Sequence, residues 1–247
     1  MPTIFLSPST QDWNQYVTGS GSEEYSMNLL ADALVPYLNA NAIGYRRNDP
    51  DGTAADAIRL GNAGNYDFYL ALHSNASAPN RAGENRGIIA FYYPGSSQGE
   101  RAAELIAEEL RQVYPLPDLV TTRAVTNLGE VRQPRAPAVL VEIGYHDNYE
   151  DAVWIENNRP AIAQALARAL TRFFGLPFIY PMDPSPGVVR VNYGTLNLRS
   201  YPSGDGPILA NLPNGAALTL YGQWEGWYTV RWQELLGYAA AAYIDMA

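Results

Sequence analysis

Short apolar runs alternate with helical patterns of apolar residues through the first 174 residues. The apolar runs predict buried strands at residues 3–7, 43–47, 68–72, 87–93, 119–125 and 138–144. The helical spacing predicts helices at residues 23–38, 53–62, 98–113 and 152–174, the last one interrupted near 157–160. Strands that alternate with helices of this length predict an α/β fold with a mainly parallel sheet flanked by helices.

The first predicted helix carries Met27, Leu30 and Leu34 on one face. Ser22 is a suitable N-cap, and acidic residues in the first turn complement the helix dipole. Of the two acidic residues there, we expect Glu23 to face solvent.

The pattern changes after residue 175. Residues 176–187 contain four prolines and predict a stiff linker. From residue 188 onward, short apolar runs separated by Gly, Pro, Asn and Asp predict a small all-β barrel or sandwich. The expected organisation is therefore an α/β domain at 1–175, a linker at 176–187 and a β domain at 188–247.

The composition of the chain excludes several classes of partner and of metal site. The chain has 47% hydrophobic and 17% charged residues, which fits a globular protein with a substantial core. A net charge of −9 without a basic run argues against a nucleic-acid partner, and the absence of cysteine excludes thiolate metal sites. We expect no membrane span, because no stretch reaches about 18 apolar residues. The N-terminus does not resemble a secretory signal, and the oligomeric state is left open.

Two residues carry candidate chemistry. His73 follows a predicted strand, where ligand-binding residues of α/β sheets gather, and it is either a metal ligand or a hydrogen-bonded structural histidine. Glu142 lies inside an apolar strand, where burial would raise its pKa toward that of a general base; the alternative is a buried ion pair with an arginine. Strand alternation places Glu142, Gly144 and His146 on one side.

A hydrolytic zinc site uses three protein ligands, a water and a nearby glutamate as general base. With two histidines and no cysteine, such a site in this chain must depend on His73 and carboxylates. Asp12, in the loop after the first strand, is a weak candidate when taken alone.

The sequence resembles the zinc-dependent N-acetylmuramoyl-L-alanine amidases over about residues 3–175. The run from Pro137 to Asn148 (PAVLVEIGYHDN) matches the family's catalytic motif, and Leu72 to Ala76 (LHSNA) matches its strand-end motif. The family's metal-ligand glutamate is followed four positions later by a residue that is often Asn, which matches Glu24 with Asn28. The resemblance implies that Glu142 is the catalytic base, that His73 and Glu24 bind zinc, and that Asn75 contacts substrate.

One part of the family pattern is missing. The first strand of the family ends in Asp-Pro-Gly-His-Gly, whose histidine binds zinc, whereas the matching residues 7–11 are Ser-Pro-Ser-Thr-Gln. Thr10, at the ligand position, is a poor zinc ligand. We expect Asp12, Gln11 or His146 to complete the site.

The C-terminal region resembles bacterial SH3-like domains. The run Thr195–Ser203 (TLNLRSYPS) looks like their Leu-Asn-Val-Arg signature. The resemblance implies binding to wall peptides, with Tyr201, Trp224 and Trp227 as candidate contacts; alternatively, some of these aromatic residues fill the small core.

The expected function is that of a cell-wall hydrolase that cleaves the amide bond between N-acetylmuramic acid and the L-Ala of the stem peptide in bacterial peptidoglycan. Such an enzyme acts at the cell wall or outside the cell. One alternative is a degenerate amidase-like protein that only binds the wall. A second is a metal-free hydrolase that pairs Glu142 with another acid.

Overall fold

The computed structural model describes residues 1–246, which form two compact units. The larger unit contains residues 3–34 and 45–174, and the smaller contains residues 1–2, 35–44 and the chain from Gly175 onward. Each unit is described by itself. Among the described residues, no helix has the length and apolar character needed to cross a membrane.

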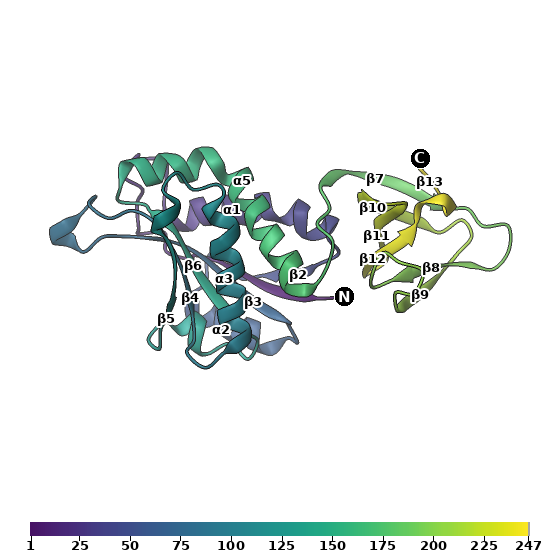
Figure 1. Ribbon diagram of the computed structural model, residues 1–247, viewed down its shortest axis with the longest axis horizontal. Coiled ribbons are helices and arrows are strands. Elements are labelled where there is room, and N and C mark those ends of the chain that lie inside the picture. Colours follow the sequence, from purple (N-terminus) through teal and green to yellow (C-terminus); the bar gives the residue numbers. More distant parts are fainter. Residues whose placement is uncertain (247) are drawn as a thin grey trace. The chain divides into compact units, whose positions relative to one another are not determined.

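The larger unit is built on a sheet whose strand order is β2-β1-β3-β6-β4-β5 (Figure 1). Pairs β1–β3, β3–β6 and β4–β5 are parallel, while β4 runs antiparallel to β6. The strands are β1 (Thr3–Pro8), β2 (Gly44–Arg47), β3 (Phe68–Asn75), β4 (Ile88–Tyr92), β5 (Val120–Ala124) and β6 (Ala138–Tyr145). The predicted α/β class with a mostly parallel sheet is confirmed.

Helices cover this sheet on both faces. They are α1 (Glu23–Ala40), α2 (Ala54–Ala63), α3 (Ser97–Arg111), α4 (Gly129–Arg132) and α5 (Tyr149–Phe174). Helix α3 packs on β4, β5 and α5, and it crosses in front of the strands in Figure 1. Helix α5 is kinked at Asn158, two residues before Pro160, within the predicted interruption. The kink follows from proline, which removes a helical N–H.

Strand alternation selects the residues that face α2 and α4. One core cluster joins Phe5, Tyr69, Ala71 and Leu140 to Ala57 of α2 and Val131 of α4. Because side chains alternate along a strand, Ser7, His73 and Glu142 fall on this same face, two residues beyond Phe5, Ala71 and Leu140. Strands β1, β3 and β6 are parallel, so their carboxyl ends meet at one edge of the sheet, where a ligand site is expected.

The smaller unit contains an antiparallel sheet that, within residues 1–246, has the strand order β13-β7-β10-β11-β12-β8-β9. Its core is formed by Leu198, Leu220 and Val230 with their apolar neighbours. The strands are β7 (Pro181–Val189), β8 (Thr195–Arg199), β9 (Ile208–Pro213), β10 (Ala217–Trp224), β11 (Trp227–Trp232), β12 (Leu235–Ala240) and β13 (Ile244–Met246). The predicted all-β character of this region is confirmed.

The proline-rich segment 176–187, which the sequence predicts to be a linker, is in part a regular strand. Its residues from Pro181 onward belong to β7, which pairs with β10. Ile179 is buried, and its backbone exchanges two hydrogen bonds with the side chain of Asn41 in the same unit. Prolines fit in the first part of β7 because it pairs with β10, whereas the pairing with β13 covers Gly187 to Val189. Proline is tolerated where a strand has a neighbour on one side. The domain boundaries themselves stay a prediction.

Candidate active site

His73 lies between two buried carboxylates. Its Nδ1 atom is 2.9 Å from Glu23 Oε1, and its Nε2 atom is 2.9 Å from Glu130 Oε2. All three side chains are almost fully buried. Burial of two carboxylates is unfavourable without compensation, so the ring between them supplies the necessary donors.

The carboxylate that meets His73 is Glu23 and not Glu24. Glu23 is 1% exposed, whereas Glu24 hydrogen-bonds Asn28 at the helix surface. The expectation that Glu23 faces solvent is therefore wrong. Two first-turn amides of α1 donate to the loop that precedes this helix: Glu23 N to Asn14 O, and Glu24 N to Gln11 O. These bonds hold the loop against Glu23.

The spacing of α1 contains the signal that identifies Glu23. Residues i, i+4 and i+7 share one helix face, so Glu23 continues the buried stripe of Met27 and Leu30 toward the N-terminus. Asn14 Nδ2 also donates to Glu23 Oε2 at 2.8 Å. The motif match alone favoured Glu24 because it has Asn28 four residues later, as in the family pattern.

Glu130 was not predicted from the sequence. It lies in the four-residue helix α4 and is 6% exposed. Its Oε1 atom accepts hydrogen bonds from Ser7 Oγ at 2.6 Å and from Tyr69 Oη at 2.8 Å. No periodicity marks a helix this short, so only tertiary structure brings Glu130 to His73.

Glu142 is the direct neighbour of His73 across the β3–β6 pair. Within residues 1–246, its buried Oε2 atom has no hydrogen-bond partner. Burial raises the pKa of Glu142 to about 7, an effect that the charge of His73 opposes and those of Glu23 and Glu130 reinforce. A carboxylate with this pKa can take and return a proton near neutral pH.

The electrostatics of the other groups follow from their mutual contacts. Burial by itself would lower the pKa of His73, but hydrogen bonds to Glu130 and Glu23 raise it well above the ordinary value. Burial would raise the pKa of each flanking carboxyl, but the bonds to His73 and its charge lower the pKa of both Glu23 and Glu130. In this arrangement His73 is an imidazolium between two carboxylates.

Of the three expected additional ligands, only Gln11 reaches the site. Its Nε2 atom is 3.4 Å from both Glu23 Oε1 and His73 Nδ1. Asp12 is exposed, and its backbone carbonyl accepts a hydrogen bond from Gln15.

His146 is held elsewhere. Its Nδ1 atom bonds Ser74 O at 2.9 Å, and its ring stacks on Tyr16. The predicted alternation through His146 fails because the β3–β6 register shifts beyond His73 and Gly144 adopts a φ of 70°. A left-handed residue at that point turns the chain out of the pleat.

The remaining candidates are partly exposed. The Asn75 side chain accepts from the Ala76 amide. Trp227 lines a groove of about 570 Å³ in the smaller unit, together with Arg190, Tyr193, Asn197 and Tyr243. Tyr201 is 39% exposed, and Trp224 packs beside Ile179 and Tyr238; neither lines this groove.

Comparisons with known proteins agree with this architecture. A family model described as N-acetylmuramoyl-L-alanine amidase matches residues 12–172, and a bacterial SH3 domain model matches residues 194–245. The first match begins after Gln11, beyond the strand-end segment that departs from the family pattern. N-acetylmuramoyl-L-alanine amidase CwlM of Bacillus licheniformis is 25% identical over 185 residues, covering 71% of this chain and 70% of the relative.

Solved structures share the fold of the larger unit. Amidase AmiC2 of Nostoc punctiforme superposes with a TM-score of 0.61 at 16% identity, covering 70% of this chain and 97% of that one. The catalytic domain of CwlV from Bacillus (Paenibacillus) polymyxa var. colistinus gives a TM-score of 0.61 at 17% identity, covering 71% and 99%. Because the amidase model spans well over half of its length, the chain belongs to the N-acetylmuramoyl-L-alanine amidase family and carries a C-terminal bacterial SH3 domain.

Proposed function

We propose that this chain hydrolyses the amide bond between N-acetylmuramic acid and the L-Ala of the stem peptide in bacterial peptidoglycan, with Glu142 as general base. The observation that carries the proposal is the position of Glu142 beside His73, with one buried oxygen unpartnered among the described residues and a pKa raised to about 7. That combination prepares a carboxylate for proton transfer.

The family is typically zinc-dependent, so the donor set has to be tested against zinc. Among the described residues, no group of three or more His, Cys, Asp or Glu is placed to hold a metal ion. His73 Nδ1, Glu23 Oε1 and the Gln11 amide nevertheless form a triangle with sides of 2.9, 3.4 and 3.4 Å. Ligands about 2.0–2.1 Å from a tetrahedral zinc ion lie about 3.3 Å apart. The two sides to Gln11 match this spacing, whereas His73 and Glu23, now hydrogen-bonded to each other, would have to separate slightly.

Gln11 completes this set through its amide oxygen. Gln11 Oε1 accepts a hydrogen bond from Asn14 Nδ2 at 3.0 Å, so presenting Oε1 to His73 and Glu23 requires the amide to rotate and give up this bond. A carboxamide is a weaker zinc donor than imidazole, and the proposed site therefore binds zinc less tightly than a site with two histidines.

The chain's own groups account for the proton transfers. When bound, zinc supplies Lewis-acid activation of water and of the scissile carbonyl. Glu142 removes the proton of the attacking water and returns it to the leaving amine nitrogen. His73 is fixed on both sides by carboxylates and lies next to Glu142 across the β3–β6 pair.

The experiment that tests this function is incubation of purified peptidoglycan with the full chain, with added Zn²⁺ and with chelator. Release of stem peptides with free L-Ala amino groups, dependent on Zn²⁺, is the expected result. A chain that binds peptidoglycan yet releases no peptide with any added divalent metal is the degenerate wall-binding protein. Release that survives thorough chelation identifies the metal-free carboxylate hydrolase.

Substitution of Gln11 tests the third ligand. Gln11→Ala removes a donor and should weaken Zn²⁺ binding by about tenfold, equivalent to about 1.4 kcal/mol. Gln11→His supplies an imidazole near the same point and should strengthen it. Competition with a chromophoric chelator measures both. Asp12→Asn, in the same loop but exposed, is the control; equal effects of the Asp12 and Gln11 changes would argue against Gln11 as a ligand.

The groove of the smaller unit supports wall binding by this domain. Tyr193 and Tyr243 are exposed aromatic side chains, and Arg190 and Asn197 line the same groove. Arginine and asparagine complement the carboxylates and amides of a stem peptide, while aromatic rings cover its apolar parts. A weak binding module tethered to a catalyst raises the local concentration of substrate.

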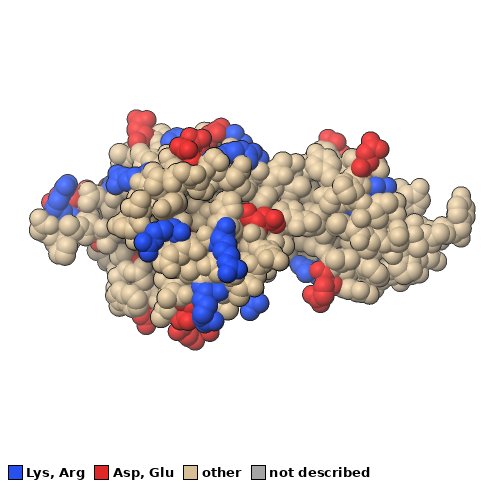
Figure 2. Space-filling model, turned by 90° about the horizontal axis from the view of Figure 1, so that it is seen from below, with Lys and Arg blue, Asp and Glu red and all other residues tan. Residues whose placement is uncertain are grey.

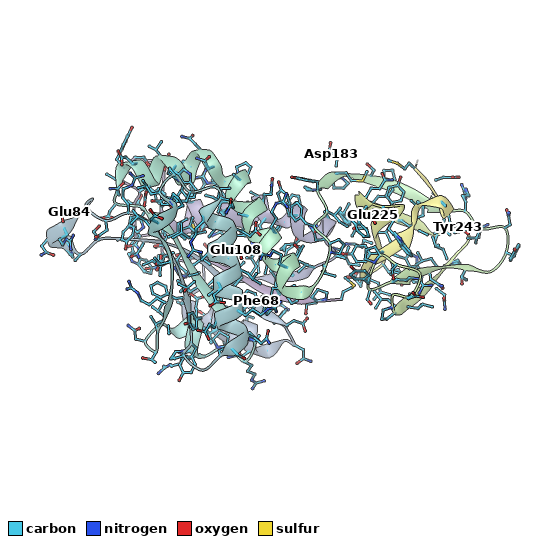
Figure 3. The ribbon with its side chains drawn as sticks, viewed as in Figure 1. Phe68, Glu84, Glu108, Asp183, Glu225 and Tyr243 are labelled. Atoms are coloured by element: carbon cyan, nitrogen blue, oxygen red, sulfur yellow. The ribbon has the colours of Figure 1, made fainter. Side chains whose placement is uncertain are left out.

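Replacing Tyr243, which is labelled in Figure 3, tests this groove. Tyr243→Ala should lower the fraction that sediments with purified peptidoglycan, with an apparent affinity loss of about tenfold for one lost aromatic anchor. Tyr149→Ala removes a similarly exposed tyrosine at the start of α5 and should leave sedimentation unchanged. Equal binding by the wild-type chain and Tyr243→Ala would place the wall contact elsewhere.

A further inference from the structure

We infer that Glu130 is a positioning residue for His73: its carboxylate fixes the Nε2 end of the ring and thereby turns Nδ1 toward Glu23 and Gln11. The inference deepens the proposed function and rests on it for its catalytic meaning. Glu130 occurs in neither motif by which the larger unit resembles the amidase family.

The contacts of Glu130 leave it little freedom. Oε2 bonds His73 Nε2 at 2.9 Å, while Oε1 accepts from Ser7 Oγ at 2.6 Å and from Tyr69 Oη at 2.8 Å. Tyr69 Oη is also 3.1 Å from Ser7 Oγ, which closes a small hydrogen-bonded network. The next residue, Val131, belongs to the core cluster and anchors α4 on the sheet. Both carboxylate oxygens are therefore engaged and buried.

The contact between Glu130 and His73 Nε2 decides which nitrogen of the ring keeps its proton. A carboxylate only accepts hydrogen bonds, so the nitrogen facing Glu130 carries a proton. Without metal, Nδ1 also faces a carboxylate, that of Glu23, and carries a proton as well. Because Glu130 retains the proton on Nε2, Nδ1 is the nitrogen that would lose its proton and present a lone pair to a bound metal ion. Carboxylate partners of ligand histidines fix the ring and its tautomer in this way in other metal sites.

Ser7 links strand β1 to Glu130. It lies near the end of β1 and donates to Glu130 Oε1 at 2.6 Å, although the two residues are 123 positions apart in the chain. Strand β1 therefore helps to hold the carboxylate that contacts His73.

Zn²⁺ binding by variants of the full chain provides the first test. Glu130→Gln should weaken Zn²⁺ binding by about 10- to 100-fold, the range for loss of a carboxylate partner of a ligand histidine. Tyr69→Phe removes a bond to the same carboxylate but not its contact with His73, so its effect should be smaller. Glu84→Gln, on an exposed loop visible in Figure 3, provides the baseline. On peptidoglycan, kcat should fall in Glu130→Gln with little change in KM.

The second test needs neither zinc nor activity. A buried imidazole N–H bound to a carboxylate exchanges slowly with water and gives a low-field proton signal. The chain has two histidines, so His73→Gln and His146→Gln assign this signal. The Nε2–H signal of His73 should be present in the wild-type chain, present in Tyr69→Phe, and lost or broadened in Glu130→Gln.

The two tests separate the two proposals. If the wild-type chain binds no Zn²⁺ but the His73 signal depends on Glu130, the zinc site fails and the positioning role holds. A Glu130→Gln variant with wild-type Zn²⁺ affinity and an unchanged His73 signal overturns the positioning role. If that variant does not fold by circular dichroism, Ser7→Ala, which removes only the 2.6 Å donor to Glu130, should give the same changes at smaller size. An unchanged signal and affinity in Ser7→Ala would then overturn it.

Discussion

Glu142→Gln is expected to abolish peptidoglycan hydrolysis while making the metal-free protein more stable at alkaline pH. Loss of a general base costs about 10²- to 10⁴-fold in rate. The stability gain arises because the ionised, buried carboxylate raises the free energy of the folded state. The same cost raises the pKa of Glu142 to about 7. Glutamine keeps the shape of the protonated acid without its charge.

The pH dependence of this stabilisation follows from the two pKa values. Above pH 7 the carboxyl is ionised in both the folded and the unfolded chain, so the folded state bears the full cost of the buried charge. Below about 4.5, the ordinary glutamate value, it is protonated in both states and the cost disappears. The shift corresponds to about 3 kcal/mol at pH 8, which should decline as the pH falls from 7 to 4.5.

Urea unfolding in the presence of chelator, at pH 8 and at pH 4.5, measures this effect. Release of stem peptides from purified peptidoglycan measures the loss of turnover. Glu84→Gln neutralises an exposed carboxylate instead and should change neither quantity. A Glu142→Gln variant that retains turnover, or that is no more stable than the wild-type chain at pH 8, would contradict the assignment.

His73→Gln should be the most destabilising single change at the site. It removes the group that both Glu23 and Glu130 contact, and one amide replaces an imidazolium between them. Breaking a buried ion pair by removing one partner costs about 3–5 kcal/mol, because uncompensated charge stays buried. Zn²⁺ binding should be lost in the same variant.

The size of this loss also depends on pH. The lowered pKa values of Glu23 and Glu130 add stability above their ordinary value of 4.5, and this stability is lost as the pH falls through the folded values. The raised pKa of His73 adds stability that is lost as the pH rises through its folded value. The difference between the wild-type chain and His73→Gln should therefore be largest near pH 6 and smaller near pH 4.

His146→Gln is the matched control for this prediction. His146 is equally buried, but within residues 1–246 its ring hydrogen-bonds Ser74 alone, at the hydroxyl and carbonyl oxygens of that residue. Loss of such a neutral hydrogen bond costs about 1 kcal/mol. Urea unfolding in chelator compares the two variants. Equal losses of unfolding free energy in the two variants would show that Glu23 and Glu130 do not form charged hydrogen bonds with His73. The same loss at pH 4 and pH 6 for His73→Gln would show this as well.

The face of the molecule drawn in Figure 2 carries charges of both signs. In Figure 2, several basic side chains lie near one another on the larger unit, with acidic side chains mainly around them. The acidic balance of the sequence had already argued against nucleic acid. A wall polymer that carries amides, hydroxyls and separate carboxylates is compatible with such a surface.

The sequence by itself determined most of the longer elements, the fold class and part of the site. Apolar periodicity located the strands that carry His73 and Glu142 and the helix that carries Glu23, because each is long enough to repeat its pattern. A carboxylate inside the apolar strand β6 is costly to bury, and this singled out Glu142. In the structure, Glu142 is the neighbour of His73 across the β3–β6 pair.

Only the tertiary structure decided which other groups meet His73. The rotation of the first turn of α1 is set by loop carbonyls, so Glu23 replaces Glu24. The bulge beyond His73 and the backbone of Gly144 turn His146 away, which periodicity cannot foresee. Glu130 reaches His73 from a helix too short to show a pattern. Local sequence fixes periodic elements, whereas a site joined across several elements depends on turns and registers that form when the core packs.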